Sequence, residues 1–383
     1  MNDLHEMMKE WRQDIHKHPE LGFCEKRTSE KVAELLTSFG LEVHTAVGGT
    51  GVVGVLKKGS SKKSIGLRAD MDALPIQEMG NKDHKSVHDG VFHGCGHDGH
   101  TAMLLGAAKY LSEQGDFDGI VHFIFQPSEE DGRGALAMME DGLFDRFPMQ
   151  EIYGAHNMPG VKKGEIALRP GQMMTSEDNF VIHVKGKGGH ASMPHMARDP
   201  LVVGAEIVTA LQSIVSRSIG PEEWGVVSVT EFITDGARNI IPSNVIIKGD
   251  VRTLDAKIQE RIETRMRDIV KGICDGQGVE GTVDYSYEFI ALKNADKETE
   301  AAASAAIKAV GKEAVEANCA ICPASEDFAQ FLRHVPGCFV LIGAGIGDDI
   351  RPLHNPHYDY EDDLLTIGVR YWSYLVQQQL TED

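Results

Sequence analysis

The sequence predicts an α/β protein with two domains: a layered main domain with a mixed, largely parallel sheet, and an inserted ferredoxin-like domain. Strand and helix patterns alternate up to residue 155 and again after residue 292, as they do in layered α/β domains. Between them, residues 178–292 change to the order β-α-β-β-α-β. A chain of 383 residues is also long enough for two domains.

The main domain begins with a regular series of elements. We expect helices over 4–17, 28–39, 100–113 and 134–141, and strands over 41–47, 51–56, 64–69, 121–126 and 151–155. Gly40 and Gly142 end two of these helices, and Pro127 ends the strand before it. After residue 292 we expect helices over 302–310 and 325–333 and a buried strand over 339–343.

The central stretch contains a complete unit of its own. Its expected elements are strands over 180–187, 225–232, 244–252 and 282–289 and helices over 199–216 and 256–276. Because α/β elements of the main domain occur on both sides of it, this unit is best explained as an insertion. The predicted domains are therefore residues 1–177 joined with 293–383, and residues 178–292.

Composition excludes several classes of function. The chain carries 58 acidic and 38 basic residues, a net charge of −20, so its overall field does not attract nucleic acid or anionic membranes. Its uninterrupted apolar runs are far shorter than the roughly 20 residues of a membrane span. Six cysteines are too few for a disulfide framework. We therefore expect a cytoplasmic protein in a reducing compartment, without nucleic-acid or membrane partners.

Side chains that can bind metals follow several of the expected strands. In open α/β sheets, ligands bind beyond the carboxyl ends of the strands. The residues at or beyond these ends are Asp70 and Asp72, Glu129 and Glu130, His156, and, in a later loop, His354. Each of these signals is weak alone, but together they place carboxylates and imidazoles at one edge of the sheet.

The strongest single motif is the run from His93 to His100, which precedes the 100–113 helix. Its eight residues contain three histidines, Cys95 and Asp98, and its glycines allow a tight loop in which several ligands converge. Thiolate, imidazole and carboxylate ligands together suit a borderline-soft divalent metal ion. The sequence therefore predicts a metal site that combines this run with the strand ends.

Other motifs do not indicate function. Gly49–Gly54 fits the glycine pattern of dinucleotide sites, but a short strand and turn follow where a helix is required. Cys319 and Cys322 are interpreted as packing residues. The sequence contains neither a Gly-x-Ser-x-Gly nucleophile motif nor His-Glu-x-x-His. The remaining histidines without a partner pattern, expected to have ordinary surface or core roles, are His16, His18, His84, His88, His122 and His334.

Several runs resemble one enzyme family along nearly the whole chain. They are 18–22 (His-Pro-Glu-Leu-Gly), 67–75 (Leu-Arg-Ala-Asp-Met-Asp-Ala-Leu-Pro), 93–100, 126–130 (Gln-Pro-Ser-Glu-Glu), 188–191 (Gly-Gly-His-Ala), 325–328 and 353–355. Together they resemble the amidohydrolase branch of the co-catalytic metallopeptidases, which includes hippurate hydrolases, indole-acetyl-amino-acid hydrolases and N-acyl-amino-acid deacetylases. The departures are Gly94 in place of alanine and Ser128 and Asp131 around the glutamate pair, and none removes a ligand.

The resemblance implies a role for each matching residue. Two divalent ions would be bound by Cys95, His97, Glu130, His156 and His354, and in that family pattern the two ions would share Cys95. Glu129 would be the general base, and Asp72 an orienting carboxylate behind the metals. Substrate contacts would come from His190, Asn244 and Arg252 on the inserted domain, which would also form the interface of a homodimer or higher oligomer.

This assignment agrees with the chemistry of amide hydrolysis. A metal ion makes water nucleophilic near neutral pH, and a second ion polarises the carbonyl of an N-acyl amino acid. One glutamate can bind metal while its neighbour moves the proton. The Cys95 thiolate favours zinc, while manganese, cobalt or nickel also suit the site. The alternatives are a dipeptidase, an N-acetyl- or N-succinyl-diaminopimelate deacylase, and, more remotely, a non-catalytic metal-binding protein.

Overall fold

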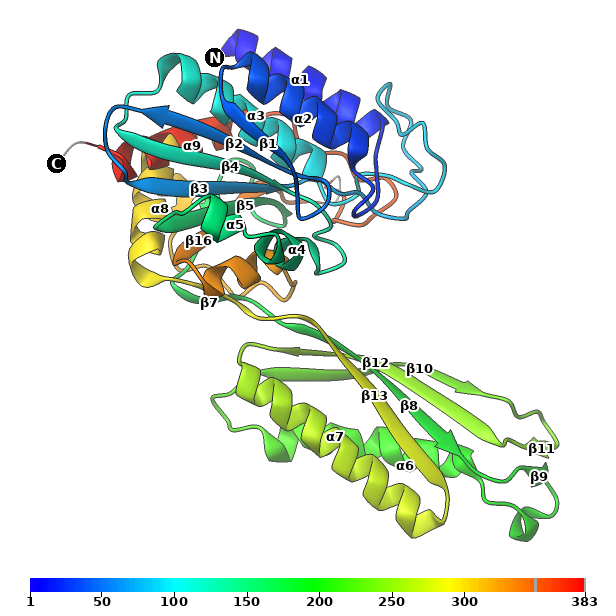
Figure 1. Cartoon of the computed structure of the whole chain (residues 1–383). Coiled ribbons are helices and arrows are strands. Elements are labelled where there is room, and N and C mark those ends of the chain that lie inside the picture. Colours follow the sequence, from blue (N-terminus) through cyan, green and yellow to red (C-terminus); the bar gives the residue numbers. More distant parts are fainter. Residues whose placement is uncertain (348–349, 382–383) are drawn as a thin grey trace. The chain divides into compact units, whose positions relative to one another are not determined.

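The structure, a computed structural model, describes residues 1–347 and 350–381 (Figure 1). These residues form two compact units. Unit 1 comprises the described residues within 1–173, 293–320 and 326–383. Unit 2 comprises residues 174–292 and 321–325. The predicted α/β class with a mixed sheet is confirmed. The roles of the inserted segment as lid and dimerisation domain stay predictions.

Unit 1 is built around an eight-stranded sheet in the order β1-β2-β4-β3-β5-β16-β6-β15 (Figure 1). Its strands are β1 (Glu42–Val47), β2 (Gly51–Lys58), β3 (Ser64–Asp70), β4 (Gly119–Gln126), β5 (Glu151–Pro159), β6 (Ile166–Ala167), β15 (Val315–Glu316) and β16 (Gly337–Gly345). The four central strands β4, β3, β5 and β16 are parallel, whereas β1, β2 and β4 pair antiparallel. The carboxyl ends of the central strands therefore meet at one edge.

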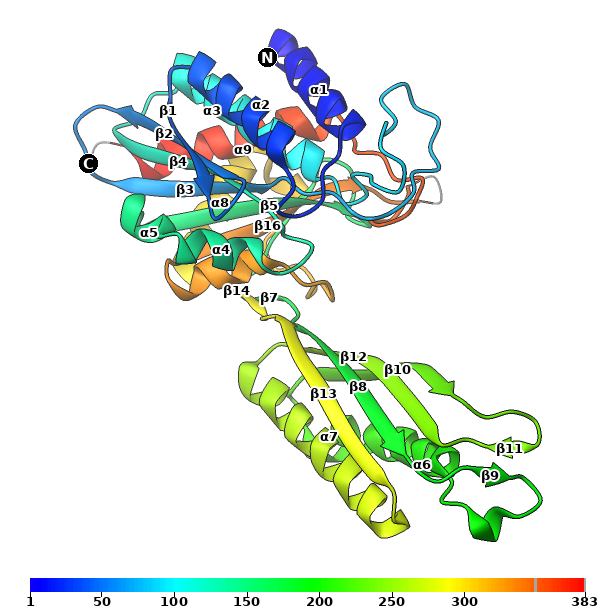
Figure 2. The ribbon, with the colours of Figure 1, turned by 45° about the vertical axis from the view of Figure 1, so that its right-hand side comes forward.

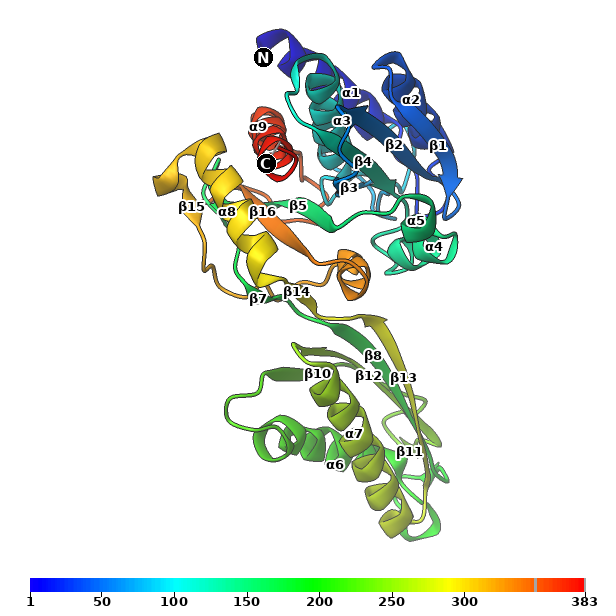
Figure 3. The same ribbon diagram turned by 60° about the vertical axis from the view of Figure 1, so that its left-hand side comes forward.

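Helices cover both faces of this sheet. One face shares a large apolar core with α1 (Asn2–Lys17), α2 (Lys26–Ser38), α3 (His97–Gln114), α8 (Asp296–Val310) and α9 (Leu364–Gln379). Figure 3 shows α3 and α9 against the same face. The remaining helices of unit 1 are α4 (Gly134–Glu140), α5 (Leu143–Arg146) and the 3₁₀ turns η3 (Lys312–Ala314) and η4 (Asp327–Arg333). The core residues of α3 are nearly continuous, because this helix lies between the sheet and other helices.

Unit 1 contains elements that the sequence did not predict, among them α5, β6 and β15, and it differs from the prediction in two longer segments. The segment 325–333 was expected to be an ordinary helix, but it is an extended residue followed by the 3₁₀ turn η4. The carboxylate of Glu326 accepts a hydrogen bond from the Phe328 N–H, which turns the chain there. The helix α9 was not identified from the sequence, although Leu365, Val369 and Trp372 lie on its buried side.

Unit 2 has the predicted β-α-β-β-α-β order (Figure 2). Its antiparallel sheet runs β10-β12-β8-β13, and one face packs on two helices. The elements are β8 (Glu177–Lys185), α6 (Pro200–Ser213), η2 (Ile214–Ser218), β10 (Gly225–Thr234), β12 (Asn244–Thr253), α7 (Ala256–Gln277) and β13 (Glu280–Phe289). Smaller pieces are β9 (Gly189–His190), η1 (Pro194–Met196) and β11 (Ile240–Ile241), and β7 (Gly171–Met174) pairs with β14 (Leu292–Asn294).

One helical segment of unit 2 is long and apolar enough to cross a membrane by length and composition alone. It spans Pro200–Ser218, and 28% of its apolar window is buried. The sequence analysis, which considered only uninterrupted apolar runs, did not identify it. Core helices meet the same criterion, and Val203, Ile207 and Leu211 of this segment lie in the apolar core of unit 2.

Candidate metal centre

The candidate metal centre lies where the central strands of unit 1 end. Asp70 ends β3, Glu129 and Glu130 follow β4, and His156 lies in β5. The helix α3 begins at His97, directly after the loop that carries Cys95. Parallel pairing of β3 with both β4 and β5 brings these segments together. This arrangement agrees with the general position of ligand sites in open α/β sheets.

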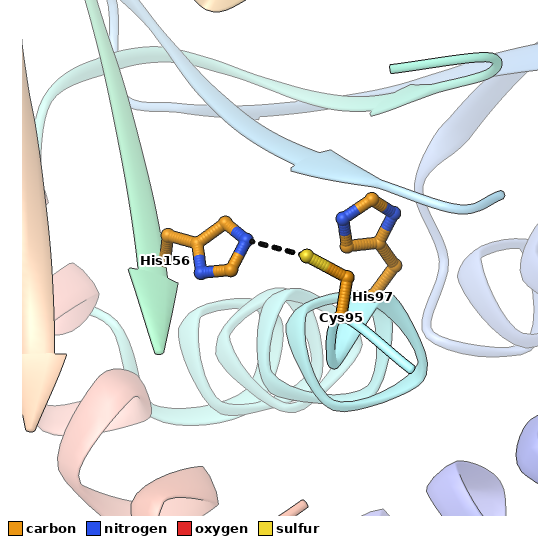
Figure 4. A group of neighbouring side chains, drawn as sticks. All are labelled: Cys95, His97 and His156. Atoms are coloured by element: carbon orange, nitrogen blue, oxygen red, sulfur yellow. Dashed lines mark hydrogen bonds between the residues drawn. The ribbon is translucent and has the colours of Figure 1, made fainter. Parts of the chain in front are cut away.

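Cys95, His97 and His156 form the first group of possible ligands (Figure 4). All three are buried, and each offers one ligand atom within 4.8 Å of the others. The Sγ atom of Cys95 lies 3.4 Å from Nε2 of His156. The Nδ1–H of His156 donates to the Asn157 carbonyl at 2.6 Å, which leaves the lone pair on Nε2 for the shared position.

A glycine makes the close approach of Cys95 and His97 possible. Gly96 has φ 97°, in the left-handed region. A Cβ atom there would lie 2.3 Å from Oδ1 of Asn157 and 2.7 Å from the hydroxyl of Tyr358. No other residue fits without moving these groups, so Gly96 fixes the geometry between two candidate ligands.

The imidazole of His97 is surrounded by carboxylates. Its Nδ1 lies 3.2 Å from Asp72, while its buried Nε2 has no hydrogen-bond partner. Carboxylate oxygens of Asp70 and Glu130 lie 3.8 Å and 3.9 Å from that Nε2. Burial opposes the charge of His97, but Asp70 and Asp72 outweigh it and raise the pKa to about 10. Such a site strongly attracts a cation.

Cys95, Glu130 and His354 form a second group with the same spacing, so Cys95 belongs to both groups. Oε1 of Glu130 is buried without a hydrogen-bond partner and lies 3.5 Å from Nε2 of His354. His354 has φ 64°, unusual for a residue other than glycine, and its N–H donates to the Gly94 carbonyl at 2.8 Å. The backbone is therefore held in a strained form that brings this imidazole to Glu130.

The adjacent glutamates have opposite electrostatic environments. Burial, then the charges of Glu326 and Glu130, raise the pKa of Glu129 well above its ordinary value. Burial also acts against the charge of Glu130, but the nearby imidazoles of His354 and His97 lower its pKa below the ordinary value. Two neighbouring carboxyl groups pushed apart in this way are suited to different tasks.

The donor set fits two divalent metal ions. Orphaned buried atoms on His97 and Glu130 face each other at 3.9 Å, and a cation supplies the partner that both lack. Burial, followed by Glu130 and Glu129, raises the pKa of the Cys95 thiol well above its ordinary value. A thiol that coordinates a metal ion loses its proton. The positive charge of the ion would then offset the repulsion between the thiolate and the two glutamates.

Supporting residues were less visible in the sequence. Asp72 accepts the N–H of Glu130 at 3.0 Å through the oxygen that does not face His97. Behind the centre, the fully buried Arg68 donates to Gln126 and Asp70 at 2.8 Å. The same guanidinium donates to Glu326 and Asp327, and the Asp327 N–H donates to Oε1 of Glu129 at 3.3 Å. One signal could have found this network: Arg68 interrupts an apolar strand.

The three predicted substrate residues lie in unit 2. Nδ1 of exposed His190 accepts the Ser192 N–H at 3.1 Å, which leaves Nε2 to carry the proton. Asn244 donates to Asp235 at 2.7 Å. The guanidinium of Arg252 pairs with Glu177 at 2.8 Å and with Asp250 at 3.0 Å. Arg252 therefore has two carboxylate partners within its own unit.

Comparisons with known proteins agree with this geometry. Residues 66–378 match Peptidase family M20/M25/M40. The hippurate hydrolase of Campylobacter jejuni is 42% identical over 378 residues, which cover 99% of this chain and 98% of that protein. The N-acetylcysteine deacetylase of Bacillus subtilis is 35% identical over 374 residues, with 97% and 96% covered.

The solved structures lead to the same group. A Bacillus subtilis protein whose structure is that of a dinuclear metal-binding peptidase from the M20 family superposes with a TM-score of 0.84 at 30% identity. The superposition covers 99% of each chain. An identity of 30% over this length indicates that the two proteins share an ancestor. The neighbour is described as binding two metal ions.

Proposed function

The chain belongs to peptidase family M20/M25/M40, and from this premise we propose which residues carry out its reaction. That reaction is the metal-dependent hydrolysis of the amide bond of N-acyl amino acids, with two divalent ions as cofactors. The observation that carries the assignment of residues is the pair of ligand groups sharing Cys95. Their members would hold the ions: Cys95, His97, Glu130, His156 and His354.

The ions would supply Lewis acidity, which makes a water molecule nucleophilic near pH 7 and polarises the scissile carbonyl. We infer that zinc is the preferred metal, because a thiolate and three imidazoles suit a borderline-soft ion. Manganese, cobalt and nickel also suit these donors. Glu130 stays anionic in this environment, which supports its role as a ligand.

Glu129 is the proposed general base. It takes a proton from the attacking water as the bond from oxygen to the carbonyl carbon forms. When the carbon–nitrogen bond breaks, Glu129 gives this proton to the leaving amine, and the products are a carboxylic acid, which ionises near neutral pH, and a free amino acid. Its raised pKa supports this role, because it makes the carboxylate a stronger proton acceptor than an ordinary glutamate.

Asp72 is a positioning residue in this proposal. Its two oxygens contact His97 Nδ1 and the N–H of Glu130, so one carboxylate orients two ligands. His190 is the proposed donor to the oxyanion that develops on the carbonyl oxygen. The hydrogen bond from Ser192 supports this, because it selects the tautomer with a proton on the outward Nε2.

Asn244 and Arg252 are proposed substrate contacts of unit 2. Asn244 is exposed, and its amide can hydrogen-bond the acyl or carboxylate group of a substrate. Arg252 would have to exchange one of its present carboxylate partners for a substrate carboxylate. We therefore expect Asn244 to contribute more directly than Arg252.

We also propose that unit 2 forms a homodimer. Leu201 and Val202 of α6 are 40% and 51% exposed, and Phe232 and Ile233 of the edge strand β10 are 41% and 44% exposed. Gly204 of α6 packs against the Phe232 ring, so α6 and β10 adjoin, and we call the exposed apolar residues of these two elements the apolar patch. Patches of this kind mark protein interfaces, and an edge strand can pair with its copy.

Sedimentation analysis tests the dimer. Val202→Glu places a charge in the patch, and we expect this variant to sediment as a monomer while the wild-type protein sediments as a dimer. Arg265→Glu changes the charge of an exposed residue on α7 and serves as the matched control. A wild-type protein that is monomeric at micromolar concentration would refute the proposal.

A substrate panel tests the proposed activity. The zinc-, manganese- or cobalt-loaded enzyme is assayed for amine release from hippurate, N-acetylcysteine, N-acetyl- and N-succinyl-diaminopimelate and a dipeptide. We expect the simple N-acyl amino acids to give the highest kcat/KM. A preference for the dipeptide or the diaminopimelate derivatives would favour those alternatives instead. Loss of bound metal in Cys95→Ala, measured on the same preparations, tests the ligand assignment.

A reducing, cytoplasmic location is the proposed setting of this enzyme. None of the six cysteines, all in the described part of the chain, forms a disulfide. The Cys95 thiol in particular has to stay reduced to bind metal. Localisation of a tagged protein by cell fractionation would test this expectation.

A further inference from the structure

A second group of possible metal ligands lies in unit 1, and the proposed reaction does not use it. We call it the His16 cluster and define it as His16, Glu78, His84 and Asp359. His16 lies near the end of α1, Glu78 and His84 lie in the loop between β3 and α3, and Asp359 lies between β16 and α9. His16, His84 and Asp359 each offer one ligand atom within 4.8 Å of the others.

The imidazole of His16 is oriented as metal-binding histidines are. It is 1% exposed, and its Nδ1 lies 2.8 Å from Oδ2 of the fully buried Asp98. A carboxylate at one ring nitrogen fixes the ring and leaves the other nitrogen free to bind an ion. That other nitrogen, Nε2, is buried and has no hydrogen-bond partner.

Glu78 faces the orphaned nitrogen at a distance that suits a shared ion. Its Oε1 lies 3.5 Å from Nε2 of His16, too far for a good hydrogen bond. Two ligands that each lie about 2.1 Å from a tetrahedral ion are about 3.4 Å apart. The other oxygen of Glu78 accepts the Ser86 N–H at 2.7 Å, which holds the carboxylate in this orientation.

His84 and Asp359 complete the cluster. The His84 ring meets the His16 ring edge-on with centroids 5.2 Å apart, and its Nε2 lies 3.0 Å from Oδ1 of Asp359. His93 contributes a further buried imidazole with its centroid 6.2 Å from that of His16, and neither of its ring nitrogens has a hydrogen-bond partner. Nitrogen and oxygen donors thus converge from three separate segments.

Several positive groups lie near the carboxylates of the cluster. The buried Arg12 donates to Oδ1 of Asp359 at 3.0 Å and lies 3.6 Å from Asp98. The exposed Lys82 lies 3.4 Å from Oδ2 of Asp359. Arg12 also pairs with Asp362. The charges of Lys85 and Lys9 also act on Glu78 and Asp362, so the case for an ion rests on the converging donors and on the orphaned Nε2 of His16.

We propose that the His16 cluster binds one zinc-like divalent ion, separate from the two ions of the reaction. Two imidazoles and two carboxylates would fill a tetrahedral site, and a site closed by four protein ligands is structural rather than catalytic. The ion ties the end of α1 and the segment before α9 to the loop that leads to Cys95. It therefore stabilises the loop that presents one of the catalytic ligands.

Metal stoichiometry of the zinc-loaded holoenzyme tests this proposal. After exhaustive desalting, we expect about three zinc ions per chain in the wild-type protein and about two in His84→Gln and in Glu78→Gln. His88→Gln is the matched control, because His88 is an exposed histidine of the same loop that contacts His18 and not the cluster. It should retain three ions.

A second readout separates loss of the ion from loss of the fold. Adding zinc back to chelated protein should raise the melting temperature less in His84→Gln than in His88→Gln, while circular dichroism shows both folded. Two ions in the wild-type protein and two in His84→Gln would overturn the proposal, as would three ions in both. The variant Cys95→Ala separates this test from the test of the proposed function. It should lose metal only from the dinuclear centre and keep the ion of the His16 cluster.

Discussion

The dinuclear centre and the His16 cluster use the same local arrangement. His97 and His16 each place Nδ1 against a buried aspartate, Asp72 in the first case and Asp98 in the second. Each leaves a buried Nε2 without a hydrogen-bond partner. A glutamate oxygen then faces that nitrogen, at 3.9 Å in the dinuclear centre and 3.5 Å in the His16 cluster.

The two regions differ in what surrounds this arrangement. The dinuclear centre adds a thiol and a second glutamate, Glu129, whose pKa is raised by burial and by Glu326 and Glu130. The His16 cluster contains no such additional base; its further neighbour is the cation Arg12. In the two proposals, oriented ligands are sufficient to bind a metal ion, whereas catalysis also requires a carboxylate that is free to move a proton.

Glu129→Gln should produce the largest effect, because it removes only that free carboxylate. We expect turnover to fall by roughly two to four orders of magnitude, the usual contribution of a positioned acid–base group. Metal content, measured by plasma mass spectrometry, should not change.

Glu130→Gln is the matched variant, because it also replaces a carboxylate by an amide, but at the neighbouring residue. It should lose metal from the dinuclear centre and activity with it. If Glu129→Gln lost metal and Glu130→Gln kept it, the two roles would have to be exchanged.

His190→Ala should have the next largest effect. It should lower the activity of the dinuclear centre without changing metal binding at either site. A donor aimed at a developing oxyanion contributes about 3 kcal/mol, so we expect turnover to fall about a hundredfold. The number of bound ions should stay the same at both sites. Ser192→Ala is a milder companion variant, because it removes the hydroxyl near Nδ1 but keeps the backbone donor. Unchanged kcat in His190→Ala would exclude the oxyanion role.

Asparagine variants of the two aspartates compare the regions directly. Asp72→Asn should weaken metal binding at the dinuclear centre, or activity, by about ten- to a hundredfold, the usual effect of a residue that orients a metal ligand. Asp98→Asn should weaken zinc binding at the His16 cluster by a similar factor. Competition with a chromogenic chelator measures both. Should Asp98→Asn leave every zinc affinity unchanged, the proposed parallel between the regions would be wrong.

Most of the fold could be predicted from local patterns, and the exceptions have physical causes. Strand β3 and helix α3 are marked by continuous apolar residues, and the order of unit 2 follows from its periodicity. The 3₁₀ turn η4 could not be predicted, because its geometry depends on Glu326 and Asp327 binding the distant Arg68. The sequence shows acidic residues at a helix start there, and only the fold supplies their cation.

The same limit applies to the sites. The dense run containing Cys95 and His97 indicates metal by its spacing alone. The His16 cluster has no such spacing, because 275 residues separate His84 from its partner Asp359. The sequence alone predicts ordinary surface or core roles for His16 and His84, whereas the proposed cluster gives them roles as ligands. Residues that meet only through the fold leave no local pattern.

His122 provides a third type of buried histidine, and its effect should be the smallest. It is 4% exposed, its Nε2–H donates to the Pro148 carbonyl at 3.2 Å, and its Nδ1 has no hydrogen-bond partner. Burial, which the bond to Pro148 only partly offsets, lowers its pKa to about 4. Without a carboxylate partner of the kind that His97 and His16 have, this imidazole stays neutral and holds no cation.

Acid should therefore destabilise the folded protein through His122. Between pH 6.5 and 4 the unfolded chain binds a proton at this position that the folded protein excludes, so the free energy of unfolding falls as the pH falls. From pH 7.5 to 5.5 this loss amounts to about 1 kcal/mol. Urea titrations should show His122→Gln losing about that much less than the wild-type protein over the same interval. Any constant cost of the substitution cancels, because only the change with pH is compared. If both proteins lost the same free energy of unfolding, water or another group would have to stabilise the charged imidazole of His122. His122 would then not differ from His97 and His16, which have carboxylate partners.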